Sequence, residues 1–147
     1  DLKADAAVAP LAAFVAERGL HDRVLIGSFS RRRLRRFRRL AGPRVATCAS
    51  PAEVAAYVVL PGRVARRLAP HVAALQVPPR VGRLPVTTSA LVRRAHTVGV
   101  PVHVWTVDDA AEMRRLLALG VDGLMTDRTD ILASIMQERG LWPRTEA

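Results

Sequence analysis

The sequence contains one cysteine, Cys48, and aromatic residues make up only 4% of its 147 residues. A single cysteine excludes an intrachain disulfide and any zinc site built on several cysteines within the chain. It is compatible with a reducing compartment, and we expect a cytoplasmic location. No run of 18 apolar residues is present, so we expect no membrane-spanning helix. The acidic Asp1 does not fit the basic start of a signal peptide, and any targeting segment is expected upstream of it.

Lysine is nearly absent as well, although the chain is strongly basic. Lys3 is the only lysine among 23 Lys and Arg residues. The sequence has 13 Asp and Glu residues, so the formal net charge is +10. Surfaces that bind nucleic acid usually mix lysine with arginine and add stacking aromatic rings. The arginine excess therefore favours a compositional bias, and no nucleic-acid partner is expected. A basic, non-catalytic module that binds nucleic acid or anionic membrane through residues 31–39 stays open as an alternative.

Strand and helix patterns alternate along the whole chain, with no linker or low-complexity segment between them. Alternation with short connections indicates parallel strands joined by crossovers. The apolar runs predict six strands, at 1–3, 24–28, 44–48, 74–77, 102–107 and 121–126. Helices are expected to begin near Asp5, Ser30, Ser50, Val64, Thr88, Asp109 and Asp130, mostly at residues that cap helix N-termini.

Two parallel α/β architectures fit this alternation. A doubly wound nucleotide-binding sheet requires a Gly-x-Gly-x-x-Gly turn, and the sequence has none. The other architecture is part of a (βα)8 barrel, although 147 residues fall well short of the roughly 250 of a complete one. We therefore expect an α/β fold that is an incomplete (βα)8 barrel.

Chemistry in such barrels sits at the carboxyl ends of the strands. Asp1 and Lys3, two residues apart, share one face of the first strand end. A carboxylate suits Mg²⁺ or Ca²⁺, and a lysine binds phosphate as a point charge. The pair suggests metal-assisted chemistry on a phosphate ester, with a terminal salt bridge as the alternative. The later strand ends carry Ser28, Phe29, Cys48, Gln76, Trp105 and Asp127.

Several motifs resemble those of the glycerophosphodiester phosphodiesterase family. The most specific is Val104-Trp105-Thr106-Val107 followed by Gly120-Val121-Asp122-Gly123-Leu124-Met125-Thr126-Asp127. Asp1-Leu2-Lys3 looks like the family's acidic-x-Lys strand end, in which the acid is usually glutamate. Gly19-Leu20-His21-Asp22-Arg23-Val24 with Ser28-Phe29 is similar to a further family segment. Departures are small: Asp108 stands where Asn is common, and Thr129 where Pro is common.

The resemblance implies a phosphoric diester hydrolase that splits a glycerophosphodiester into an alcohol and glycerol 3-phosphate with the help of a divalent cation, Mg²⁺ or Ca²⁺. Asp1 would be a metal ligand and Lys3 a phosphate contact. Trp105 and Phe29 would form an apolar wall for the substrate, and Gln76 either lines the site or packs in the core. The basic helix at 31–39 also suggests peripheral membrane contact.

The resemblance covers the C-terminal two-thirds of the family barrel, so residues 1–147 are expected to form one partial barrel domain with strands three to eight. The family's first two strands, with a His-Arg-Gly and a Glu-x-Asp, have no counterpart here. None of the four histidines matches a catalytic position. We expect His21, His71 and His96 at the surface, and His103 as a hydrogen-bonded histidine inside the barrel. The isolated chain is then expected to be inactive, and its two open sheet edges to favour dimerisation or aggregation. A degenerate barrel remnant is the remaining alternative.

Overall fold

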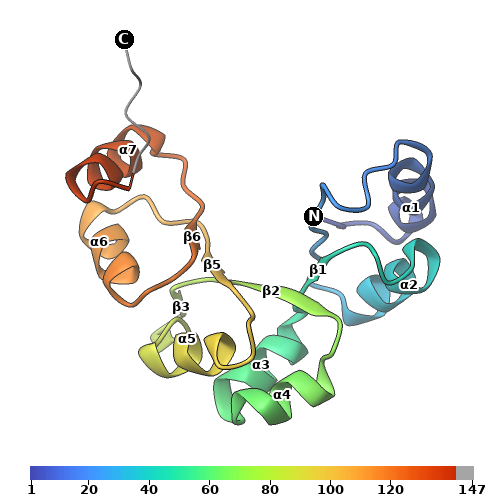
Figure 1. Cartoon of the computed structure of the whole chain (residues 1–147), viewed down its shortest axis with the longest axis horizontal. Coiled ribbons are helices and arrows are strands. Elements are labelled where there is room, and N and C mark those ends of the chain that lie inside the picture. Colours follow the sequence, from blue (N-terminus) through green and yellow to red (C-terminus); the bar gives the residue numbers. More distant parts are fainter. Residues whose placement is uncertain (142–147) are drawn as a thin grey trace.

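The computed structural model describes residues 1–141 and shows one parallel sheet whose strands follow one another in chain order (Figure 1). Its order is β1-β2-β5-β6. These strands span Thr47–Cys48, Val72–Val77, Val102–Val104 and Gly123–Leu124. A doubly wound sheet reverses its strand order partway, whereas a barrel adds each strand beside the last. The observed order is therefore that of a barrel segment.

The first two predicted strands extend this sheet without becoming regular strands. Ile26 pairs with Thr47 in an isolated parallel bridge, and the Leu2 N–H donates to the Gly27 carbonyl at 2.8 Å. All six predicted strand segments thus lie side by side in chain order. The predicted strand end at 1–3 and the predicted strand at 24–28 do not form regular strands, because each makes too few ladder hydrogen bonds.

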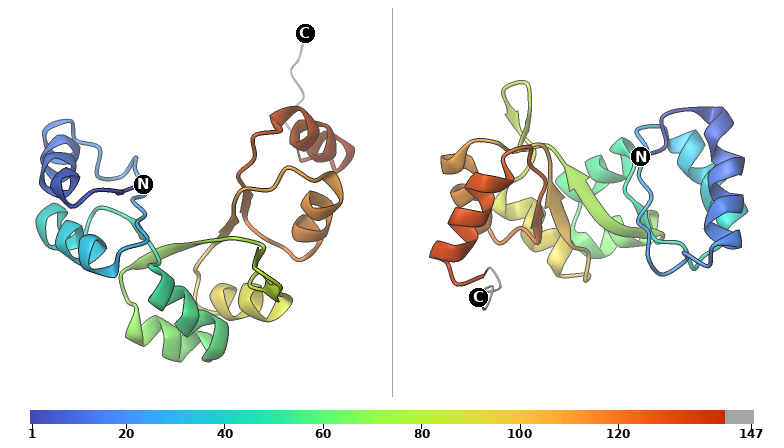
Figure 2. Two further views of the ribbon diagram at one scale, coloured as in Figure 1. Left: turned by 180° about the vertical axis from the view of Figure 1, so that it is seen from behind. Right: turned by 90° about the horizontal axis from the view of Figure 1, so that it is seen from above.

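Helices lie on the convex side of an arc, and the strands line its concave side (Figure 1; Figure 2, left). A short 3-10 helix, η1, covers Asp5–Ala7. The α-helices are α1 (Val8–Glu17), α2 (Arg31–Ala41), α3 (Pro51–Val59), α4 (Gly62–Leu68), α5 (Ser89–His96), α6 (Ala110–Ala118) and α7 (Thr129–Glu138). One face of the sheet is therefore covered by helices, as in the outer ring of a barrel.

Helix starts agree with the capping residues read from the sequence at α2, α3, α5 and α6. Asp5 instead begins η1, which precedes α1, and α4 begins at Gly62, two residues before the predicted Val64. The side chains of Ser30, Thr88 and Asp109 each accept a hydrogen bond from the backbone N–H three residues later. Ser50 and Glu53 form a reciprocal capping box at α3. The predicted cap at Asp130 is wrong, because Asp130 lies inside the first turn of α7 and pairs with Arg128.

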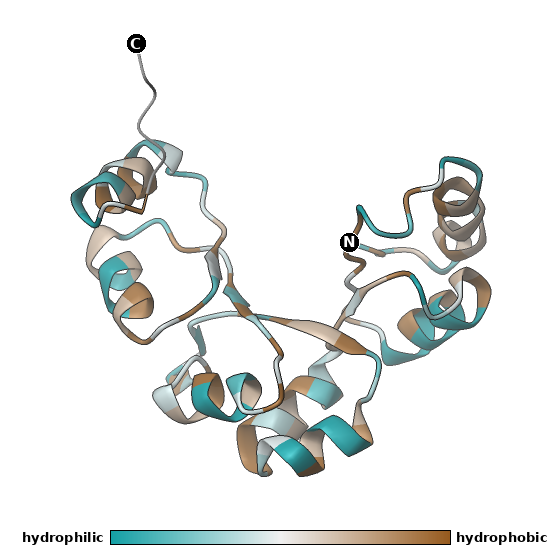
Figure 3. Cartoon of the chain, in the orientation of Figure 1, coloured by the Kyte–Doolittle hydropathy of each residue, from teal (hydrophilic) through white to brown (hydrophobic). Residues whose placement is uncertain are grey.

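The core lies between the sheet and the helices. The register places Leu75 beside Val102 and Val77 beside Val104, and all four are buried in the larger apolar cluster with residues of α5 and α6. Gln76 lies beside His103 in the same ladder and alternates with these apolar residues, so both belong to the concave face. Figure 3 shows the resulting contrast between the hydrophobic β2 and the mostly hydrophilic α2.

A small antiparallel hairpin follows β2 where a loop was predicted. It joins β3 (Arg80–Val81) to β4 (Leu84–Pro85) and projects from one edge of the arc (Figure 2, right). Gly82 has φ of +58°, which suits the first position of a two-residue hairpin turn. The flanking prolines indicated a loop, but edge strands tolerate proline because no ladder N–H is required there.

No helix within residues 1–141 is long and apolar enough to cross a membrane. The predicted domain boundary at residue 147 lies outside the described residues.

Candidate active site at the carboxyl ends of the strands

A cavity of about 790 Å³ opens at the carboxyl ends of the strands. Four of the five predicted site residues line it: Asp1, Phe29, Gln76 and Trp105. Lys3, the fifth, is exposed and does not belong to the cavity wall. The concave edge of the sheet therefore gathers side chains from segments more than 100 residues apart in the sequence.

Phe29 and Trp105 form an aromatic pair at this cavity. Their rings meet edge to face, with centroids 5.7 Å apart and planes at 88°, an arrangement that aromatic quadrupoles favour. Trp105 follows β5 and is half-buried, whereas Phe29 remains 67% exposed. The pair provides an apolar surface in the cavity wall.

Gln76 reaches the same cavity from β2 and packs against the segment that carries Gly27. A Cβ on Gly27 would stand 3.4 Å from Gln76 Oε1 and 3.8 Å from Cys48 Sγ. Gly27, Gln76 and Cys48 therefore lie side by side in the cavity wall, at ordinary van der Waals separation. Burial raises the pKa of the Cys48 thiol to about 11, so this cavity residue is neutral at physiological pH.

Of the residues that the structure describes, Asp1 is the single acidic one in the cavity wall. Within residues 1–141 no group of three His, Cys, Asp or Glu side chains could hold a metal ion. Mg²⁺ and Ca²⁺ are coordinated by six or more oxygen ligands, and one carboxylate provides only a small part of them. The described residues therefore do not fit a complete cation site, and we derive no chemical step through a metal. The salt bridge considered between Asp1 and Lys3 is not among the ion pairs of residues 1–141.

The segment that carries Asp1 is fixed by polar contacts to its neighbour. The buried Ser28 hydroxyl donates to the Leu2 carbonyl at 2.7 Å, and Arg33 Nη1 donates to the same oxygen at 3.0 Å. Arg33 also pairs with Asp5 at 2.8 Å. These contacts anchor residues 1–5 to the start of α2 and set the direction of the Asp1 backbone.

Asp108 joins the ends of β5 and β6. Its carboxylate accepts hydrogen bonds from the Thr126 hydroxyl at 2.8 Å and from the Asp127 N–H at 2.9 Å. The hydrogen bond from Thr126, together with the one from the Asp127 N–H, holds the pKa of Asp108 below its usual value. The sequence places Asp127 at the end of the last predicted strand, and the structure shows that Asp108 binds its backbone N–H there.

The histidines occupy positions that partly match their prediction. His103 lies on the concave face against Gly123, where an added Cβ would stand 3.0 Å from its ring, but within residues 1–141 the ring makes no hydrogen bond. His96 is at the surface, 2.8 Å from Asp122. His71 is exposed, as expected, and lies in the turn between α4, which ends at Leu68, and β2.

Sequence reasoning missed one wall of the cavity. Val54 and Val58 of α3 line it together with Val81 and Val86 of the hairpin region. The spacing of Val54 and Val58, four residues apart on a helix, signals a shared face. The sequence of neither segment alone shows that the hairpin and α3 line one cavity, because the two segments are separated by more than 20 residues.

The fold is a segment of a parallel α/β barrel, and a cavity with apolar and polar lining residues opens at the carboxyl edge of its sheet. These two features define a scaffold of the barrel-enzyme type. The model of the "Glycerophosphoryl diester phosphodiesterase family" matches residues 2–131, and the chain belongs to this family. A probable glycerophosphodiester phosphodiesterase 2 of Mycobacterium tuberculosis is 42% identical over 146 residues, which cover 97% of this chain and 55% of that protein.

Solved structures agree on the fold. A putative glycerophosphoryl diester phosphodiesterase from Silicibacter pomeroyi is 26% identical with a TM-score of 0.72, over 92% of this chain and 45% of that one. A glycerophosphodiester phosphodiesterase from Parabacteroides distasonis, 20% identical with a TM-score of 0.66 over 95% of this chain and 56% of that one, shows the fold alone. The chain thus spans about half the length of these relatives.

Proposed function

We propose that this chain is part of a glycerophosphodiester phosphodiesterase and that the cavity at the strand ends binds its substrate. The observation that carries the proposal is the convergence of Phe29, Gln76, Trp105 and Asp1 on one cavity at the carboxyl edge of the sheet. Family membership supports the reaction class, hydrolysis of a glycerophosphodiester to an alcohol and glycerol 3-phosphate.

The substrate's glycerol or alcohol group would contact the Phe29–Trp105 pair, whose rings present apolar surface beside polar groups. Gln76 is half-buried in the same wall and offers both an amide donor and an acceptor to a hydroxyl. Lys3, outside the wall but two residues from Asp1, would contact the phosphate. Asp1 would be one ligand of the divalent cation that the family resemblance implies, with further ligands from outside the described residues.

We also propose that the chain represents strands three to eight of the barrel, with the first two strands supplied by residues outside it. Coverage of about half of each relative and an arc that does not close support this proposal. The general acid and base of the family would then be absent from this chain, so the isolated chain would be inactive. A cytoplasmic location is proposed as well, supported by the single cysteine.

The test is a turnover assay with glycerophosphocholine in the presence of Mg²⁺ or Ca²⁺, on this chain and on a chain extended upstream of Asp1. We expect turnover only from the extended chain, with a raised KM for Trp105→Ala. Phe14→Ala, which removes an exposed aromatic ring on α1 far from the cavity, is the matched control. Equal KM values for Trp105→Ala and Phe14→Ala would contradict the proposed substrate wall.

A further inference from the structure

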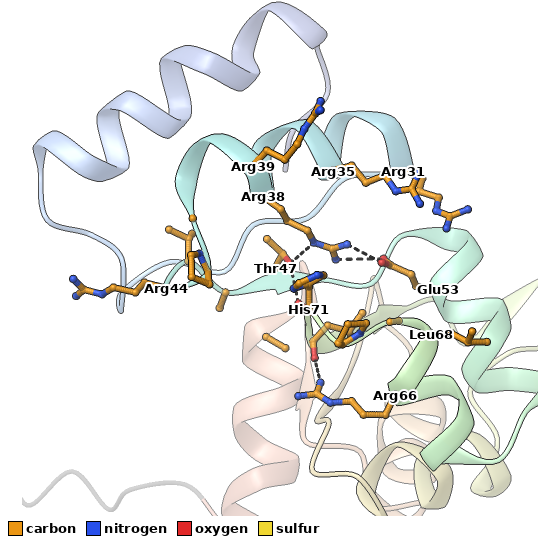
Figure 4. Close-up of a pocket in the computed structure, with 18 of the residues that line it drawn as sticks. Arg31, Arg35, Arg38, Arg39, Arg44, Thr47, Glu53, Arg66, Leu68 and His71 are labelled. Atoms are coloured by element: carbon orange, nitrogen blue, oxygen red, sulfur yellow. Dashed lines mark hydrogen bonds and ion pairs between the residues drawn. The ribbon is translucent and has the colours of Figure 1, made fainter.

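A second, larger hollow lies at the opposite edge of the sheet, where β1 and β2 begin. This groove has a volume of about 1390 Å³ and runs between α2 and the turn that follows α4 (Figure 4). Its floor is formed by the starts of β1 and β2, including Thr47 and Val72. Barrel chemistry occurs at the other edge, so the proposed phosphodiesterase activity leaves this groove unexplained.

Arginine dominates the lining of this groove. Within residues 1–141, seven arginines and one acidic residue, Glu53, line it. Arg38 engages Glu53 through two hydrogen bonds of 2.7 and 3.3 Å, and its Nε donates to Thr47. Arg44 pairs with Asp22 at the surface. The remaining five arginines have no acidic partner within residues 1–141.

Three of these five form a row along α2, and we call Arg31, Arg35 and Arg39 the rim arginines. They are spaced four residues apart, which places them about 6 Å apart along one helix face. Each is exposed, and none makes a side-chain hydrogen bond within the described part of the chain. Arg66 stands across from them with His71 and Leu68 (Figure 4). Within residues 1–141 no acidic side chain pairs with these charges, so the rim attracts anions.

The buried Arg38–Glu53 pair gives the groove a fixed shape. It links α2 to α3 beneath the rim, and both side chains are only 13% exposed. Glu53 is itself held by the backbone N–H and hydroxyl of Ser50. The single acid is thereby neutralised inside the wall, so it does not repel an incoming anion. A preorganised wall lowers the entropic cost of binding.

We propose that this groove binds a soluble ligand that carries several phosphate groups in a row. Guanidinium groups bind phosphate oxygens in bidentate fashion, and a row of them matches a chain of phosphates better than a single ion. The recessed floor disfavours a flat bilayer, which reaches only protruding residues. Among the residues that the structure describes, no Phe, Trp or Tyr lines the groove, and these residues offer no stacking platform to the bases of a single-stranded nucleic acid.

The test uses tripolyphosphate as the probe and titration calorimetry on this chain at fixed ionic strength. The groove variant replaces the rim arginines together, Arg31→Gln, Arg35→Gln and Arg39→Gln. The control variant removes the same charge elsewhere, at the exposed Arg23, Arg83 and Arg93, each changed to Gln. Circular dichroism confirms that both variants fold. We expect the groove variant to weaken tripolyphosphate binding at least tenfold and the control less than threefold.

Equal weakening in the two variants would overturn the proposal, because the attraction would then be diffuse charge. Inorganic phosphate that binds as tightly as tripolyphosphate would also overturn it. Two competition arms use phosphatidylglycerol vesicles and a single-stranded oligonucleotide. Tighter, rim-dependent binding of either one would replace the soluble ligand with a membrane or a nucleic acid. Binding is measured without turnover, so the result does not depend on the phosphodiesterase proposal.

Discussion

The ion pair between Arg38 and Glu53 offers a sharp test of how α2 is attached to the rest of the molecule. We expect Glu53→Ala to destabilise the protein because it leaves the Arg38 guanidinium, 13% exposed, without its carboxylate partner. Breaking a buried pair costs about 3–5 kcal/mol, and the residual exposure places this one near 3. Loss of the hydrogen bonds to Ser50 adds about 1 kcal/mol for the helix cap.

The assay is urea unfolding followed by circular dichroism, with Arg38→Ala and the double variant completing a thermodynamic cycle. The double variant should cost less than the sum of the single ones, because removing both partners leaves no unpaired buried charge. Glu138→Ala is the matched control, since its pair with Arg114 is 46% and 56% exposed. Surface pairs contribute at most about 1 kcal/mol.

The same pair predicts a pH dependence. Burial raises the pKa of Glu53, but hydrogen bonds from Arg38 and Ser50 outweigh it and hold the pKa below its usual value. A lowered folded-state pKa means that the pair stabilises the protein above the unfolded pKa, about 4.5. That stabilisation is lost as the pH falls through the folded-state value. If Glu53→Ala cost no more than Glu138→Ala at pH 7, the proposed attachment of α2 would be refuted.

Three further outcomes are expected. Gly62→Ala should lower the free energy of unfolding by about 2–3 kcal/mol in urea titrations, because its Cβ would overlap the Arg94 carbonyl of α5; an unchanged midpoint would contradict this. Phe37→Ala, at a fully buried ring, should cost about 3–5 kcal/mol by the same measurement. Cys48, with a pKa of about 11, should resist iodoacetamide at pH 8 in the folded protein and react in urea, as followed by mass spectrometry.

Helices and their starts were predictable because capping is local. Each cap is a hydrogen bond between residues three positions apart, as at Ser30, Ser50, Thr88 and Asp109. The residues that form the bond are therefore visible in the local sequence pattern. At α7 no side-chain cap forms, and the prediction failed.

Features that depend on distant segments were predictable only in part. The aromatic pair of Phe29 and Trp105 was expected at one site through family motifs, not through spacing. The hairpin was missed, and so was the cavity wall that it shares with α3, because packing between segments is not encoded in either one alone. Lys3 was placed with Asp1 by strand alternation, but residues 1–3 form no strand and the cavity wall includes Asp1 without it.

The most direct measurement is choline release from glycerophosphocholine, compared between this chain and a chain extended upstream of Asp1 by the length that its relatives have. We expect release from the extended chain, lost on Asp1→Ala and weakened through KM on Trp105→Ala. No release is expected from the 147-residue chain. Turnover by that chain alone, abolished by Asp1→Ala, would contradict the proposal that part of the active site lies outside this chain.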